Sequence, residues 1–164
     1  MATLKRYNNV SETMLKAIFA DVLARSIIHP SVQQLAAEII ADSSEPVIAV
    51  YDWMKQNVAY VNDPVDAESI IAPWVMVEMY RNGEKLGGDC DDQATWVAAL
   101  LGAAGYDTKI VLLGQLSAEF DHAIASVMVP GIYRDTWVDV DTTSGMQPTW
   151  WQNVVRRVEI GPSR

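Results

Sequence analysis

The segment that most constrains the fold is an apolar helix predicted over residues 89–105, DCDDQATWVAALLGAAG. Its first turn is acidic, a long apolar run follows, and Gly105 provides a stop signal. Because the helix is apolar on most sides, it is expected to be central, with the other elements packed around it.

The chain before this helix is expected to be mostly helical. Residues 11–28 have apolar positions at helical spacing, Ser31 and Gln34 fit a capping box, and a third helix is predicted to start near Pro46. The stretch 60–74 contains two prolines, which predict a loop with short extended pieces.

Three β-like segments follow the central helix, at 108–114, 122–129 and 136–141. A chain in which the helices come first and an antiparallel sheet follows has the α+β pattern. The length predicts one domain over 1–164, of which 1–60 is the mostly helical N-terminal part.

Composition excludes several classes of function. A formal net charge of −9 disfavours nucleic-acid binding and docking on anionic membranes, because both need a basic surface. One cysteine rules out an internal disulfide, and no apolar run resembles a signal peptide or a membrane span. The expectation is a soluble cytoplasmic protein.

The only cysteine, Cys90, lies in the sequence GGDCDD. If Asp89 is the N-cap, the sulfur lies at the positive end of the helix dipole, which favours the thiolate. The adjacent carboxylates oppose a second negative charge, so the outcome depends on whether Asp91 and Asp92 face away from the sulfur. The alternative is a structural cysteine buried on a core helix.

A reactive thiol needs a base, and the chain has two histidines. His29 precedes a proline and is expected at the surface of a helix junction, whereas His122 opens a strand. A carboxylate would have to orient the His122 imidazole, and the register of the hairpin decides which one faces it. In an antiparallel pair the numbers of opposed residues have a constant sum: a sum of 263 places Asp141 opposite His122, and a sum of 261 places Asp139 there. A longer loop through 130–134 favours Asp141, because a two-residue Pro-Gly turn suits hairpins poorly.

Three sequences in this order resemble the transglutaminase-like superfamily of cysteine enzymes: GGDCDDQATWVAALLGAAGYDTKIVL, FDHAIASVMVPG and TWVDVDTT. The resemblance is greatest to small stand-alone bacterial and bacteriophage domains, and it covers roughly residues 45–145. It implies a papain-like α+β core over 70–145 and a catalytic triad of Cys90, His122 and Asp141. In one departure, Thr142 replaces the usual proline after the aspartate.

The resemblance also implies a thiolate–imidazolium pair and an acyl-thioester intermediate formed from an amide of a protein or peptide substrate. The reaction could be that of a peptidase, a deamidase or a transglutaminase, without a cofactor. The backbone N–H of Cys90, after Gly88, is the expected first oxyanion donor, and Trp74, Tyr60 and Gln93 are candidates for a second.

Two other functions fit parts of the sequence. A catalytically inactive domain that binds or scaffolds a protein partner would also contain many tryptophans and a thiol surrounded by acids. A metal site could combine Cys90 and His122 with the carboxylates of Asp89, Asp91 and Asp92, but this set matches common zinc spacings poorly, and no metal is predicted.

Overall fold

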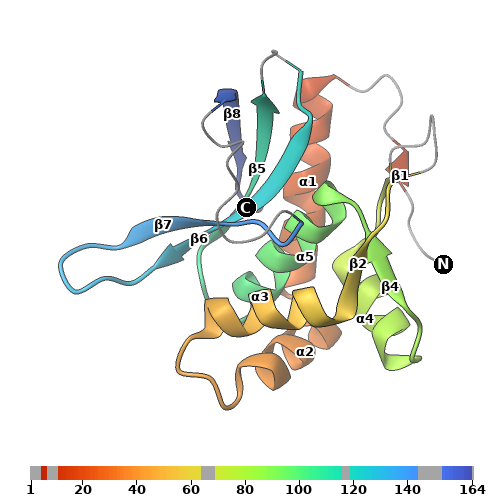
Figure 1. Ribbon diagram of the computed structural model, residues 1–164, viewed down its shortest axis with the longest axis vertical. Coiled ribbons are helices and arrows are strands. Elements are labelled where there is room, and N and C mark those ends of the chain that lie inside the picture. Colours follow the sequence, from red (N-terminus) through yellow and green to blue (C-terminus); the bar gives the residue numbers. More distant parts are fainter. Residues whose placement is uncertain (1–4, 7–10, 64–68, 116–118, 144–152, 164) are drawn as a thin grey trace.

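The computed structural model describes residues 5–6, 11–63, 69–115, 119–143 and 153–163. Helices gather on one side of a four-stranded antiparallel sheet of order β7-β6-β5-β8 (Figure 1). The helices are α1 (Glu12–Ile27), α2 (Pro30–Ile40), α3 (Pro46–Asn57), α4 (Pro73–Arg81) and α5 (Cys90–Ala103). The sheet strands are β5 (Thr108–Gln115), β6 (His122–Val129), β7 (Thr136–Val140) and β8 (Val154–Ile160).

Two short strand pairs lie outside this sheet. β2 (Val58–Tyr60) runs parallel to β4 (Leu86–Gly88), and β1 (Lys5–Arg6) pairs antiparallel with β3 (Ser69–Ile70). The pairing of β2 with β4 brings the end of α3 next to the segment that leads into α5. Among the described residues, no helix has both the length and the apolar character that crossing a membrane requires.

Helix α5 is the centre of the molecule, as its apolar sequence predicts. Its residues from Asp92 to Gly102 are buried, and it packs against α1, α2, α3, β5 and β6 (Figure 1). The Asp89 carboxylate caps the helix by accepting from the backbone N–H groups of Asp91 and Asp92. Gly105 adopts a positive φ of 96° just after the helix, where a residue with a Cβ would be strained.

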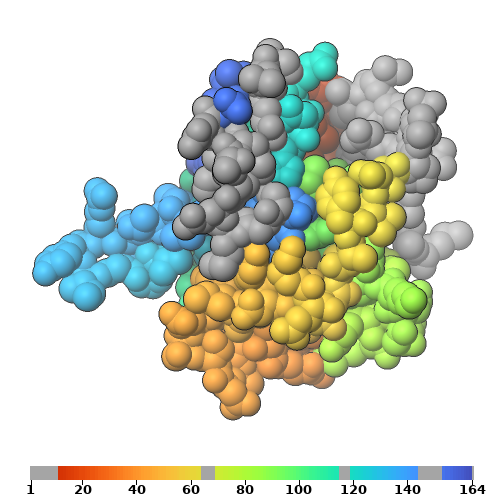
Figure 2. Space-filling view, in the orientation of Figure 1, coloured from red at the N-terminus to blue at the C-terminus, as the bar shows by residue number. Residues whose placement is uncertain are grey.

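The sheet has a core face and an outer face. Alternate residues of β5 and β6, among them Leu112, Ala125 and Val127, join the main core with α5. Ile124 points to the other face, where it forms a smaller apolar cluster. The β6–β7 hairpin projects away from the body (Figures 1 and 2), and Tyr133 at its end is 99% exposed. The predicted α+β class is therefore confirmed.

The start of α2 differs from the predicted capping box. The helix begins at Pro30, whose fixed φ suits a first helical residue, and His29 is the N-cap. The Nδ1 atom of His29 accepts from the backbone N–H of Ser31 at 3.4 Å, while Gln34 donates to Glu38 further along the helix. The cap therefore lies two residues earlier than the Ser31–Gln34 pattern indicates.

Helix α4 and strand β8 were not predicted from the sequence. Helix α4 begins at Pro73, which had indicated only the end of a loop, and one face of this short helix is buried through Met76 and Val77. Strand β8 forms the second edge of the sheet beside β5, and half-buried residues alternate with exposed ones along it as far as buried Ile160. Both elements are short, and their local patterns are weaker than that of α5.

The register of the β6–β7 hairpin also differs from both predicted alternatives. Val129 pairs with Thr136 and Ala125 with Val140, so the opposed residue numbers sum to 265, and neither 263 nor 261 is correct. The loop spans 130–135, and Gly131 packs so closely against the backbone carbonyl of Arg134 that a side chain would not fit. The expected longer loop is present, with two more residues than a sum of 263 requires.

Candidate active site

The imidazole of His122 and the carboxylate of Asp141 are in direct contact. His122 Nε2 lies 2.9 Å from Asp141 Oδ2, and both side chains are largely buried, with exposed fractions of 12% and 2%. The second oxygen of Asp141, Oδ1, accepts from the backbone N–H of Thr143 at 2.9 Å and from its hydroxyl at 2.7 Å. Asp141 is therefore fixed from two sides and in turn orients the imidazole ring.

Cys90 lies beside this pair at the first turn of α5. The backbone N–H of Ala123, the residue after His122, hydrogen-bonds to the sulfur. Helix α5 packs directly on β6, which brings the thiol to the beginning of the strand where His122 is located. Two elements far apart in sequence thus place the thiol and the imidazole at one point.

A cavity of about 280 Å³ opens over this point, and both Cys90 and His122 line it. Its apolar wall comes from α1, β5 and the segment before β6, with Leu15, Phe19, Leu112 and Phe120. Its polar wall includes Tyr60, Asp89, Asp91 and Asp121. The cavity therefore presents a thiol and an imidazole to a ligand that has both apolar and polar groups.

The surroundings of Cys90 favour the protonated thiol. Burial, and after it the charges of Asp89 and Asp91, raise its pKa to about 12, although hydrogen bonds from the Ala123 N–H and from its own backbone N–H act to lower it. The thiolate–imidazolium pair implied by the family resemblance is thus not favoured electrostatically here. A thiolate at this position needs a base that accepts its proton.

The two acids after Cys90 behave differently. Asp92 turns away into the protein, where its Oδ1 accepts from the backbone N–H of Ile71 at 2.6 Å. Asp91 remains close enough to the sulfur to raise its pKa. Burial raises the pKa of Asp91 well above its usual value, and a hydrogen bond with Asp89, which requires a shared proton, raises it too. Of the carboxylates of Asp91 and Asp92, only that of Asp92 therefore faces away from the Cys90 sulfur.

Ile71 connects this region to the central helix through both of its backbone polar groups. Its N–H donates to Asp92 and its carbonyl accepts from the indole N–H of Trp96 at 2.8 Å. Both partners lie on α5 and are almost fully buried. Asp92 therefore binds the segment before α4 to the central helix. The sequence analysis did not predict this structural role.

Gln93 is engaged in a buried network beneath the cavity. Its Nε2 donates to the carbonyl of Gly88 at 3.0 Å, and its Oε1 accepts from the hydroxyl of Thr142 at 2.8 Å. Thr142 follows Asp141 directly, so this network connects the segment before Cys90 to the segment that contains the acid. Gln93 does not line the cavity among the described residues, whereas Tyr60 does.

Trp74 lies at a different place from Cys90. It lines a small surface pocket with Arg25 and His29, where the imidazole stacks on the indole at 5.7 Å and the guanidinium lies 5.2 Å from its ring centre. His29 is half-buried at the junction of α1 and α2. The structure thus brings together Tyr60, Gly88, Cys90 and His122 but does not bring Trp74 to them.

Carboxylate oxygens of three residues could hold a cation. Ligand atoms of Asp89, Asp91 and Asp92 lie within 4.8 Å of one another. Neither Cys90 nor His122 belongs to this group, in contrast to the mixed metal site considered from the sequence. Two of the three already have structural partners, because Asp89 caps α5 and Asp92 binds the Ile71 N–H.

A cysteine at the start of a central helix, beside a histidine–aspartate pair on the adjoining sheet, is an arrangement typical of thiol enzymes. Comparison with known proteins identifies the family. Residues 33–142 match the model of the transglutaminase-like superfamily. The chain therefore belongs to the transglutaminase-like superfamily, which confirms the resemblance noted in the sequence. Comparison with curated proteins gave no match.

Two solved structures share this fold at low sequence identity. A putative cysteine protease from Cytophaga hutchinsonii aligns with a TM-score of 0.59 and 18% identity, over 93% of this chain and 47% of the other. A putative protease from Parabacteroides distasonis aligns with a TM-score of 0.51 and 17% identity, over 75% of this chain and 26% of the other. The present chain therefore spans about half or less of these larger proteins.

Proposed function

We propose that this protein is a thiol enzyme that cleaves or transfers the acyl group of an amide in a protein or peptide substrate. Cys90 is the nucleophile, His122 is the general base and acid, and Asp141 orients His122. The observation that carries the proposal is the 2.9 Å contact between His122 and Asp141, together with the Cys90 thiol, which lines the same cavity as His122.

In this mechanism each ring nitrogen of His122 has its own role. Nε2 carries a proton and donates to Asp141, which leaves Nδ1 as the atom that accepts the proton of the Cys90 thiol. The sulfur attacks the amide carbon as the proton moves to Nδ1. His122 then returns the proton to the leaving amine, and an acyl-thioester remains on Cys90. Water or a second amine attacks the thioester and restores the free thiol.

The raised pKa of Cys90 fits a particular form of this mechanism. The resting thiol is neutral, and the thiolate forms only while His122 takes the proton during attack. Negative charge then develops on the carbonyl oxygen of the substrate. The backbone N–H of Cys90 is the first donor for this oxyanion, and the Tyr60 hydroxyl, on the polar wall of the cavity, is the second.

The experiment that tests the proposal is covalent labelling with an electrophilic peptide probe, such as a peptidyl vinyl sulfone that carries a fluorophore. Wild-type protein is expected to form one adduct, located at Cys90 by mass spectrometry. Cys90→Ala should form none, and His122→Ala should react at least about 100-fold more slowly, because its general base is absent. An equal labelling rate in wild type and His122→Ala would overturn the proposal.

A second candidate function is supported by the same pKa. A half-buried thiol held neutral by burial and two acids is also what a catalytically inactive member of the superfamily would retain. Such a protein would bind a protein partner through the same cavity. It would show no labelling of Cys90 beyond that of an unfolded thiol, whereas the enzyme would be labelled faster by the peptide probe than by a simple alkylating agent.

A further inference from the structure

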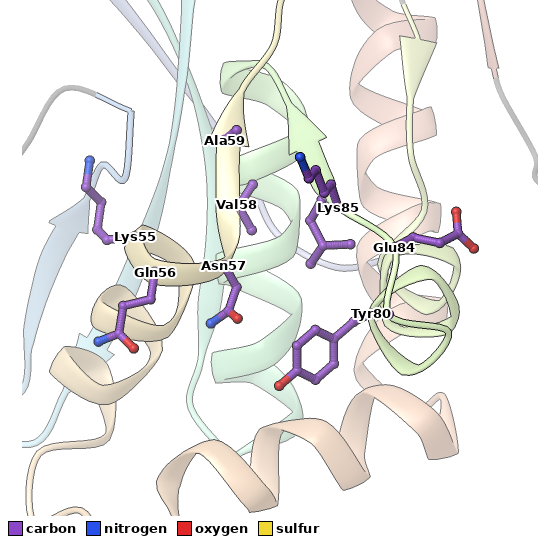
Figure 3. Close-up of a pocket in the computed structure, with 10 residues that line it drawn as sticks. Lys55, Gln56, Asn57, Val58, Ala59, Tyr80, Glu84 and Lys85 are labelled. Carbon is purple, nitrogen blue, oxygen red and sulfur yellow. The ribbon is translucent and has the colours of Figure 1, made fainter.

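A second and larger pocket, of about 560 Å³, lies where α3 passes into β2. Figure 3 shows its walls: Lys55 and Asn57 come from the end of α3, and Tyr80 and Lys85 come from α4 and the turn before β4. Lys55 and Lys85 flank the α3–β2 junction from opposite sides, and the carboxylate of Glu84 extends away from both of them. The pocket therefore has one lysine on each side of this junction.

This local charge is unusual in a protein with a net charge of −9. Among the lysine and arginine side chains that the structure describes, all but three form an ion pair with a carboxylate. The three exceptions are Lys55, Lys85 and Arg134, and two of them line this pocket. Lys55 donates to the carbonyl of Thr142 at 3.0 Å, which fixes its position without neutralising its charge.

The pocket and the candidate active site are neighbours along β2. Val58 and Ala59 line the pocket, and Tyr60, the next residue of the same strand, lines the cavity of Cys90. Two residues of a strand span about 7 Å, so a ligand in one site is within a few residues of the other along an extended peptide. The bond from Lys55 to Thr142, the residue after Asp141, provides a second connection.

We propose that this pocket is a subsite that binds an acidic side chain of an extended peptide substrate, a few residues from the bond that Cys90 attacks. This inference rests on the proposed function for the nature of the substrate. The Lys85 ammonium supplies the positive charge and the hydrogen-bond donors that a carboxylate requires, and Lys55 adds positive charge from the other side of the α3–β2 junction. The preference is local and opposes the long-range field of the acidic protein, which would by itself favour basic peptides.

Binding of labelled peptides to the Cys90→Ala variant of this chain tests the subsite without turnover. The probes are fluorescein-labelled decapeptides in which a single glutamate is moved along a neutral sequence, and matched peptides contain glutamine at the same position. Fluorescence anisotropy is expected to show tighter binding with glutamate at one or two adjacent positions. The difference should decrease with added salt, because the contact lies near the surface.

Substitution of the lysines tests whether the pocket is responsible. Lys85→Gln is expected to weaken binding of the best glutamate peptide about threefold, which is the effect on affinity expected from the loss of a partly exposed ion pair. The affinity for the matched glutamine peptide should not change. Adding Lys55→Gln should increase the loss to about tenfold. Arg134→Gln is the matched control, since it removes an unpaired charge from the β6–β7 loop, outside the pocket. Equal affinity for glutamate and glutamine peptides, or an equal loss in Arg134→Gln, would overturn the inference.

The outcomes also separate this inference from the proposed function. Labelling of wild-type Cys90 by peptide probes with no preference for glutamate would support the thiol enzyme and overturn the acidic subsite. Glutamate-dependent binding through Lys85, with no labelling of Cys90, would support the subsite as a peptide-binding pocket and overturn the enzymatic proposal.

Discussion

His122 Nε2 and Asp141 Oδ2 lie 2.9 Å apart although the strand register does not pair their residues. In the register of the hairpin, position 122 would oppose position 143, and the two side chains meet diagonally where the strands end. Thr143 holds the other oxygen of Asp141, so the carboxylate cannot turn away from the imidazole without losing two further hydrogen bonds. This contact is the basis of the first prediction.

Asp141→Asn is expected to reduce the rate of Cys90 labelling by the peptide probe by about 100-fold or more. The amide can still hydrogen-bond to Nε2, but it does not stabilise the imidazolium that forms during attack. Asp139→Asn is the matched control, because Asp139 lies two residues earlier, on β7, and pairs with Arg157 instead of His122. A similar loss in both variants would mean that Asp141 acts only on stability.

Asp89→Asn is expected to lower the pKa of Cys90 and to increase its reactivity with iodoacetamide. Asparagine preserves the helix cap but removes the first of the two carboxylate charges that, after burial, hold the thiol pKa high. Each unit of decrease gives about tenfold more thiolate at a pH well below the pKa. The measurement is the alkylation rate as a function of pH in the two proteins.

Asp42→Asn controls for the change in net charge, because Asp42 is exposed on the turn after α2. If Asp89→Asn and wild type give the same alkylation profile, the carboxylates do not influence the thiol, and another cause must keep it neutral.

Asp92→Asn is expected to make stability less dependent on pH. Burial raises the pKa of Asp92 from 3.8 to about 7 in the folded protein. Between these values the folded state binds more protons than the unfolded state, so this group makes the free energy of unfolding decrease as pH rises from about 4 to 7. Urea denaturation across this range should show a smaller decrease in the variant. A steeper decrease in Asp92→Asn than in wild type would contradict the assignment.

Gly88→Ala is expected to be far more disruptive than Gly87→Ala. A Cβ at Gly88 would lie 2.7 Å from the Cβ of buried Asp92 and 3.0 Å from the ring of Trp96, neither of which can move freely. A Cβ at Gly87 would meet mainly a methyl group of Val61 at 2.7 Å, and Val61 is 53% exposed.

The expected loss of stability for Gly88→Ala is about 1–3 kcal/mol, typical of overpacking in a core, together with slower labelling of Cys90. For Gly87→Ala the thermal midpoint should be close to that of wild type, because Val61 can rotate away. If thermal denaturation gave equal losses for the two variants, Gly88 would have no special packing role.

Sequence patterns were most informative where one local signal dominated. The acidic first turn, the apolar run and Gly105 predicted the position and burial of α5, because helix dipole, hydrophobic burial and left-handed backbone all act within one segment. The three strand segments were also predicted at their observed positions, because the apolar pattern of a strand is a local signal as well. Helix α4 and strand β8 have weaker local patterns, and they are stable here through neighbours that are distant in the chain.

The sequence by itself determined the class of fold and the residues that could form a thiol site, since both follow from residue type and local periodicity. Only the tertiary structure decided how these residues interact. Packing of α5 on β6 buries Cys90, and this burial favours the neutral thiol. The hairpin register, in which opposed residue numbers sum to 265, makes His122 and Asp141 meet diagonally. The sequence also did not determine that the Asp92 carboxylate turns toward the backbone N–H of Ile71. Burial and electrostatic fields depend on atoms contributed by the whole chain, and no local stretch such as GGDCDD contains them.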